Sequence, residues 1–244
     1  DIFTPLYNNQ IPPGAGSVVH YQFKVPEDQQ AALRVSVRLN YRKFDTSYMQ
    51  YVYGEDYVND LPVSLLAEDV VHFPVAGSKA PEPDSTAAIT PSAFPAWQRW
   101  NDYGIGLLLK GSAGSDKGEL KQASKAFAEV ESLGRPEGPV NRARVFFKEG
   151  RVDDAARALQ RAAGFTPPAP RWTMAWFTGR VHAQNGELDE AIQNYKSILE
   201  DRYPELDERG FDFSKDYVVI NELGQTYYLR SKLERGQPER EKQF

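Results

Sequence analysis

Two arginines placed alike in the sequence are the side chains best suited to bind an ion. Arg144 follows the small residue Ala143, and Arg180 follows the small residue Gly179, 36 residues further on. Guanidinium groups form paired, charge-assisted hydrogen bonds with carboxylates. With Lys148 close by in the sequence, this arrangement predicts a clamp for a carboxylate or an acidic peptide. The alternative is that both arginines simply lie on a solvated helix face.

Histidine and cysteine give little support for a metal site. His20, His72 and His182 are the only three histidines, and no pair has the spacing of a zinc-binding helix. Cysteine is absent, which excludes disulfides, Cys-ligated zinc and covalent haem attachment within this sequence. We expect His182 to be a packing residue and His20 to be an ordinary strand residue.

The glycine-rich and acidic segments do not match catalytic or nucleotide-binding motifs. Residues 104–111 lack the third glycine of a dinucleotide loop, and residues 111–118 lack the Gly-Lys-Ser/Thr of a phosphate loop. The acidic stretch 201–216 lacks the residue order of a calcium loop and is expected to be a solvated loop. No Ser, His and Asp share a nucleophile context. The sequence therefore predicts a protein that is not an enzyme and holds no metal.

Charge and hydropathy exclude two classes of partner. The net charge of −5 argues against a general surface for nucleic acid or anionic membranes, which needs clustered Lys and Arg. The longest apolar run, around residues 107–109, is far below the roughly 20 residues that cross a bilayer. We expect neither nucleic-acid binding nor a membrane span.

The elements that carry these residues change type along the chain. Residues 33–41 alternate strictly between apolar and polar side chains, which predicts a strand with one buried and one wet face. Residues 17–25 are a further strand candidate, and residues 47–53 and 70–75 are shorter ones. We therefore expect a small antiparallel β-sandwich over residues 1–77. A proline-rich linker at 78–95 follows, and helical periodicity begins at 96.

A repeated pattern dominates the helical part. Three segments share the spacing Gly-x4-Ala-x3-large apolar residue, and their glycines lie 32 and then 36 residues apart. The small residues let two helices approach closely, and the large residue fills the groove between repeats. The members of the pattern are Gly118, Ala123 and Phe127; Gly150, Ala155 and Leu159; and Gly186, Ala191 and Tyr195.

Two further segments resemble the first helix of a tetratricopeptide repeat (TPR). They are Trp100-x2-Tyr103-Gly104-x2-Leu107 and Ile220-x2-Leu223-Gly224-x2-Tyr227, which are similar to the family pattern W-x2-L-G-x2-Y. Residues 97–244 resemble the TPR family, which implies an α-α superhelical array of about three and a half repeats over 96–244. The expected fold class is α+β, in two domains. A generic helical bundle is the structural alternative.

The TPR resemblance implies a concave groove lined by the first helices, which binds a partner protein or peptide. A scaffold for protein–protein interaction is therefore the leading functional prediction, and two arginines in the groove favour an acidic partner. The groove residues expected from the register are Asn101, Arg144, Phe147, Lys148, Trp176, Arg180, Asn221 and Tyr228.

The whole chain also resembles the C-terminal part of periplasmic multihaem c-type cytochromes that carry TPR repeats. The similarity lies in DIFTPLYNNQIPPGAGSVVHYQF (1–23), LNYRKFDTSYM (39–49) and NDLPV (59–63). It implies a periplasmic or other extracytoplasmic location, and haem in an adjoining segment but none in this chain. An electron-transfer accessory that packs against a cytochrome domain is thus the alternative function, with His20 as a candidate axial ligand.

Overall fold

A computed structural model of the protein describes residues 16–29, 31–73, 94–112, 118–208 and 210–234. The chain divides into two compact units, one of residues 21–92 and one of residues 1–20 with 93–244. The predicted linker, 78–95, lies almost wholly outside the described residues.

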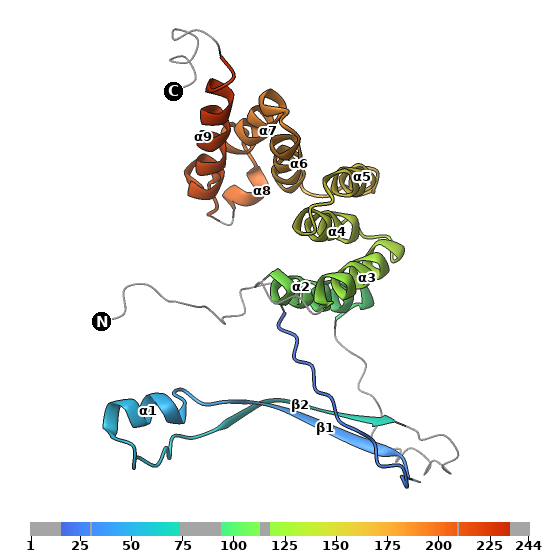
Figure 1. The fold of residues 1–244 in the computed structure, drawn as a ribbon, viewed down its shortest axis with the longest axis vertical. Coiled ribbons are helices and arrows are strands. Elements are labelled where there is room, and N and C mark those ends of the chain that lie inside the picture. Colours follow the sequence, from blue (N-terminus) through green and yellow to red (C-terminus); the bar gives the residue numbers. More distant parts are fainter. Residues whose placement is uncertain (1–15, 30, 74–93, 113–117, 209, 235–244) are drawn as a thin grey trace. The chain divides into compact units, whose positions relative to one another are not determined.

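The second unit is a row of antiparallel helix pairs (Figure 1). The second helix of one pair packs against the first helix of the next, so the pairs stack in sequence order. Successive helical hairpins after Pro95, as predicted, are confirmed. The helices are α2 (Ala96–Ser112), α3 (Glu119–Ser132), α4 (Glu137–Lys148), α5 (Val152–Ala163), α6 (Arg171–Asn185), α7 (Leu188–Glu200), the short α8 (Pro204–Asp207) and α9 (Tyr217–Ser231).

Glycine makes the tight turns within the pairs. Gly150, between α4 and α5, has φ +74°, and Gly186, between α6 and α7, has φ +80°. This left-handed backbone is accessible to glycine without steric cost, and it lets the following amide bond back to the end of the first helix. Arg151 N donates to Phe146 O at 2.8 Å in the first of these turns. Gly150 and Gly186 therefore lie in the turns of the repeat and not at a helix crossing.

Small residues set the helix spacing inside a pair. A β-carbon on Gly104 would lie 2.5 Å from the ring of Phe127, and one on Gly179 would lie 2.8 Å from the ring of Tyr195. Both aromatic rings are fully buried. In these two pairs, the large residue of the second helix therefore fills the space that a side chain on the first helix would occupy. The members of the repeated pattern after each glycine are all buried: Ala123, Phe127, Ala155, Leu159, Ala191 and Tyr195.

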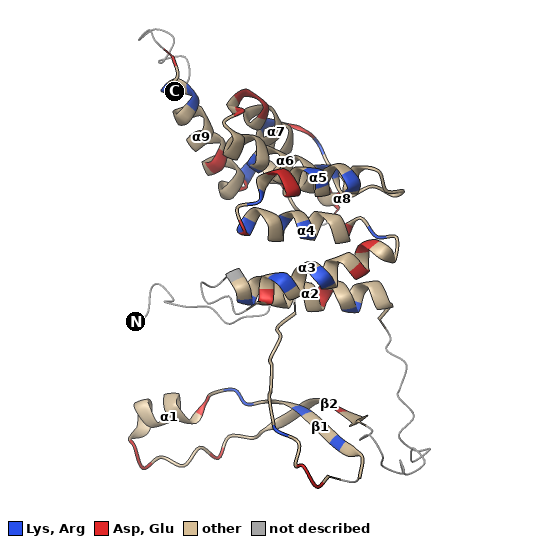
Figure 2. Cartoon of the chain, turned by 45° about the vertical axis from the view of Figure 1, so that its right-hand side comes forward, with Lys and Arg blue, Asp and Glu red and all other residues tan. Residues whose placement is uncertain are grey.

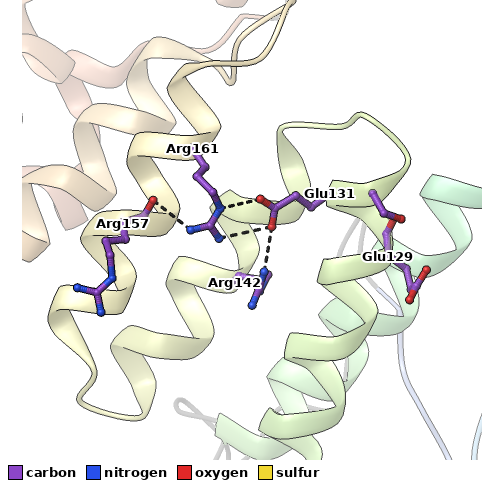
Figure 3. Close-up of polar contacts among 6 residues, drawn as sticks. Glu129, Glu131, Arg142, Arg157 and Arg161 are labelled. Atoms are coloured by element: carbon purple, nitrogen blue, oxygen red, sulfur yellow. Dashed lines mark hydrogen bonds and ion pairs between the residues drawn. The ribbon is translucent and has the colours of Figure 1, made fainter.

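An ionic cluster connects the first two helix pairs (Figure 3). Glu131 on α3 accepts hydrogen bonds from Arg142 Nη1 on α4 at 3.0 Å and from Arg161 Nε on α5 at 2.7 Å. The Arg161 guanidinium also donates to the carbonyl of Arg157. Because Glu131 receives both cations from the next pair, it fixes how the pairs stack.

The acidic stretch 201–216 is more ordered than expected. It contains α8 and the short 3-10 helix η1 (Phe213–Lys215), and Tyr203 within it is buried. The Tyr203 ring lies 5.2 Å from that of Trp172 on α6 and 5.9 Å from that of Phe213. The expectation of a solvated loop was therefore wrong for Tyr203 and Phe213, which pack against Trp172, whereas Phe211 and most of the carboxylates are exposed.

In the described part of the first unit, residues 21–29 and 31–73, the sheet is a two-stranded antiparallel ribbon rather than a sandwich. β1 (Leu33–Tyr41) pairs with β2 (Ser64–Phe73), with an irregularity between Leu39 and Asn40. The predicted strand 33–41 is confirmed, but its apolar face is not covered, since Val37 and Leu39 are more than half exposed. Two strands alone have no second layer to bury a face against. The β-sandwich is not confirmed among the described residues.

Two of the segments predicted as strands do not form strands. Residues 47–53 lie in helix α1 (Thr46–Tyr53), because Asp45 caps its first turn by accepting from Tyr48 N at 2.6 Å. Residues 17–25 form no strand. Of the predicted strand 70–75, residues 70–73 belong to β2, and 74–75 lie outside the described residues.

Residues 16–20 group with the helical unit. A β-carbon on Gly106 of α2 would lie 2.8 Å from Val18, and one on Gly16 would lie 2.8 Å from the carbonyl oxygen of Asp102. Val18 packs against the apolar cluster that contains Leu107. Residues 16–18 thus pack against α2 instead of pairing as a strand.

Candidate functional site

A groove opens where the first helices of three successive pairs lie next to one another. It has a volume of about 280 Å³. Leucines of α2 form one wall, α4 contributes the centre, and aromatic residues of α6 form the opposite wall. Its lining residues are Leu108, Leu109, Arg144, Phe147, Lys148, Trp176, Phe177 and Arg180.

Two asparagine side chains hold Arg144 in place. Its Nη1 donates to Asn141 Oδ1 at 2.9 Å, and Asn141 in turn donates from Nδ2 to Asn101 Oδ1 at 2.8 Å. Asn141 is buried, so this chain of amides links α2 to α4 and orients the guanidinium. The Arg144 guanidinium carbon also lies 5.9 Å from the centre of the Phe177 ring.

Arg180 is positioned by aromatic rings. Its guanidinium carbon lies 4.5 Å from the centre of the Phe147 ring and 5.7 Å from that of Trp176. Stacking on a ring face favours a cation but leaves the in-plane N–H donors available to a ligand. The two arginines thus present donors from adjacent repeats into one groove.

The charges of these two arginines are not compensated. Within the described part of the chain, neither Arg144 nor Arg180 has a carboxylate partner, whereas Arg142 and Arg161 pair with Glu131 and Arg230 pairs with two carboxylates. Burial, followed by repulsion from Arg180, lowers the pKa of Arg144. A partly desolvated pair of like charges is costly unless an anion joins it, so the groove is electrostatically suited to an anionic group.

Residues 108–170 and 140–206 match the family described as Tetratricopeptide repeat. Residues 108–206 form a TPR segment. The match overlaps the helix pairs that carry the groove, α4–α5 and α6–α7, and includes the end of α2. No curated protein and no solved structure matches the chain significantly.

The TPR register places five of the predicted groove residues together. Arg144, Phe147, Lys148, Trp176 and Arg180 all line the groove. They come from equivalent turns of consecutive first helices, which is why the spacing of the repeats sufficed to predict that they meet. Figure 2 colours the Lys and Arg positions along the α4 ribbon blue.

The other predicted site residues lie elsewhere. Asn101 supports Arg144 through Asn141 instead of lining the groove. Asn221 and Tyr228 are exposed on α9, where the Tyr228 ring lies 4.1 Å from Lys232 Nζ. His20 is exposed and lines none of the three pockets described in this article. Its role as an axial ligand to haem stays a prediction.

A second hollow adjoins the groove and was not predicted. It has a volume of about 360 Å³ and shares Trp176 and Phe177 with the first. Its other lining residues are Trp172, Thr173, Ile198, Phe213, Asp216, Val218 and Val219. Phe177 could have been found from the sequence, since it lies three residues before Arg180 on the same helix face. Phe213 could not, because it belongs to the acidic stretch 201–216, an inserted segment between α7 and α9, and not to the repeat.

A third hollow, of about 210 Å³, lies within the inserted segment and is lined by acidic and aromatic residues of 199–214. Among the described residues, no three His, Asp or Glu side chains come together in a way that could hold a metal ion. No helix within the described ranges is both long enough and apolar enough to cross a membrane.

Proposed function

We propose that the chain is a non-enzymatic scaffold whose groove binds an anionic segment of a partner protein. TPR repeats generally mediate protein–protein interaction, and the matched residues include the repeats that form the groove. The partner would enter as a peptide segment and place a carboxylate between Arg144 and Arg180.

One observation carries the proposal: the two groove arginines are oriented but not neutralised. Arg144 is fixed by Asn141, and Arg180 by Phe147 and Trp176. Since their positions are set before a ligand arrives, little side-chain freedom is lost on binding. A carboxylate between them would relieve the repulsion of like charges and accept charge-assisted hydrogen bonds from both.

The test is a titration of the chain with a fluorescein-labelled hexaglutamate peptide, with labelled hexalysine as the comparison, followed by fluorescence anisotropy at low ionic strength. We expect binding of hexaglutamate only. Arg144→Ala combined with Arg180→Ala should weaken it by about tenfold or more, because both charge-assisted contacts are removed.

The matched control removes two cations outside the groove, through Arg157→Ala and Lys196→Ala. Both side chains are solvent-exposed and pair with carboxylates of their own helix. This control should bind hexaglutamate as the wild type does. Equal weakening in both double variants would show a net-charge effect, and unchanged affinity in the arginine variant with intact helicity would overturn the proposal.

The alternative, an electron-transfer accessory in an extracytoplasmic cytochrome, rests on the resemblance of residues 1–23, 39–49 and 59–63 alone. The described residues do not enclose His20 in a pocket. A haem absorption band that copurifies with the chain from its native source, and that is lost in His20→Ala, would favour this alternative over the scaffold.

A further inference from the structure

The hollow next to the arginine groove is apolar and belongs to the same surface. Trp176 and Phe177 of α6 separate the two and line both. On the far side the walls are Trp172, Phe213 and Val219. A ligand that crosses the α6 aromatic residues would therefore pass from two cations into an apolar space.

The single charged residue that lines this hollow is already engaged. Asp216 accepts hydrogen bonds from Val218 N at 2.9 Å and Val219 N at 3.3 Å and so caps α9. A carboxylate that caps a helix is satisfied by the backbone amides. The hollow therefore presents apolar side chains, and not an unpaired charge, to whatever enters it.

The wall supplied by the inserted segment is held rigidly. The Tyr203 hydroxyl donates to Ser197 O at 3.0 Å, and the Phe213 ring lies 6.1 Å from Trp172 and 5.2 Å from Phe211. Asp212 caps η1 by accepting from Ser214 N at 3.0 Å. The hollow is thus formed before a ligand binds, and its volume of about 360 Å³ falls within the range of about 300–1,000 Å³ of pockets that accommodate ligand groups.

We propose that the partner segment is bipartite, with a carboxylate at Arg144 and Arg180 and a large apolar side chain in the hollow between Trp172, Phe213 and Val219. This inference rests on the proposed function, because the arginines define where the segment lies. The occupant is an extended segment of another protein in which an acidic residue is followed or preceded closely by an aromatic or large aliphatic one. The apolar anchor supplies selectivity that two cations alone cannot give.

The experiment is a selection of random dodecapeptides displayed on phage against the immobilised 244-residue chain. We expect the selected peptides to combine acidic residues with an aromatic or large aliphatic residue at a constant separation. Acidic peptides without an apolar preference would overturn the bipartite inference and leave the proposed function standing. Apolar peptides without acidic residues, or no enrichment at all, would overturn both.

Variants then locate the apolar subsite with the selected peptides. Val218 lines the hollow and is 43% exposed, so Val218→Gln makes the hollow polar without a change of charge or of the buried core. We expect its affinity for the bipartite peptides to fall about tenfold, with hexaglutamate binding unchanged. Leu229→Gln, on the same helix and 48% exposed but outside the hollow, is the control. Equal affinity of Val218→Gln and wild type would place the apolar residue elsewhere and refute the inference.

Discussion

The backbone at Gly104 lies directly against the ring of Phe127, so that an added β-carbon would come within 2.5 Å of the ring. Gly224 is the equivalent residue on α9. A β-carbon added there would meet no atom within 4 Å, and the residue is exposed. The same small residue therefore has opposite physical roles at the two positions. At Gly104 it allows close helix packing, and at Gly224 the space beside it is open.

This contrast predicts opposite effects of one substitution. Gly104→Ala should destabilise the chain by about 1–3 kcal/mol, because the buried Phe127 ring has little room to move. Gly224→Ala should stabilise it by about 0.5–1 kcal/mol, because alanine favours the helix and meets no neighbour. Urea unfolding followed by circular dichroism measures both. A destabilised Gly224→Ala variant would show that α9 is covered in solution.

Protonation of Glu131 should weaken the stacking of the first two helix pairs. Burial by itself would raise the pKa of Glu131, but the hydrogen bonds and charges of Arg161 and Arg142 outweigh it, so the pKa is lowered. A carboxyl whose pKa is lowered in the folded state stabilises the fold when the pH is above the ordinary pKa of a glutamate. This stabilisation is lost as the pH falls through the lowered pKa.

Glu131→Gln should therefore cost about 1–2 kcal/mol at pH 7, and the difference from wild type should shrink toward pH 3. Urea unfolding at pH 7, 5 and 3 is the measurement. Glu129→Gln on the exposed face of the same helix (Figure 3) should change little at any pH. A deficit in Glu131→Gln that is the same at all three pH values would contradict the ionic explanation.

The hydroxyl of Tyr195 should contribute nothing to stability. The residue is fully buried and the hydroxyl has no hydrogen-bond partner among the described residues. Burial raises the pKa of Tyr195 to about 12, so the group is neutral at pH 7. Tyr195→Phe should be neutral or stabilise by up to about 1 kcal/mol, whereas Tyr195→Ala should cost about 3–5 kcal/mol. A clearly destabilised Tyr195→Phe variant would reveal a bound water or other partner.

The register of the repeats can be tested at Ala155. Its side chain is 1% exposed and packs in the cluster with Ala143, Leu159 and Val181. Ala155→Arg should cost several kcal/mol, about 4 or more, because a long charged side chain cannot fit at this helix crossing. Gln160→Arg, exposed on the same helix, is the control. If both variants have the melting temperature of the wild type, the assigned register is incorrect.

Arg144 and Arg180 lie in one groove for a local reason, and their role in binding a partner stays a prediction. Arg144 and Arg180 each follow the small residue of a first helix, and helical periodicity then determines which way they point. Since the pairs stack with nearly the same geometry, residues at equivalent positions of successive first helices lie next to one another. Asn221 and Tyr228 follow the same rule but lie on α9, beyond the groove that Arg144 and Arg180 share.

The strand predictions failed where local propensity competed with other interactions. Residues 47–53 include three Tyr and one Val, yet capping by Asp45 favours the helix α1. Residues 17–25 have a strand composition, but Val18 packs on α2 at Gly106 instead. Neither competing contact can be read from the composition of the segment itself.

The sequence by itself determined the helical repeat, its small-residue contacts and the positions of the two groove arginines, because each follows from a periodicity of a few residues along one helix. The tertiary structure decided the apolar hollow, the Glu131 cluster and the uncovered ribbon. Phe213 meets Trp172, and Glu131 meets Arg161, across about 40 and 30 residues of chain. Such contacts depend on how an inserted segment folds back and on which side chains find a partner, and no local pattern encodes either.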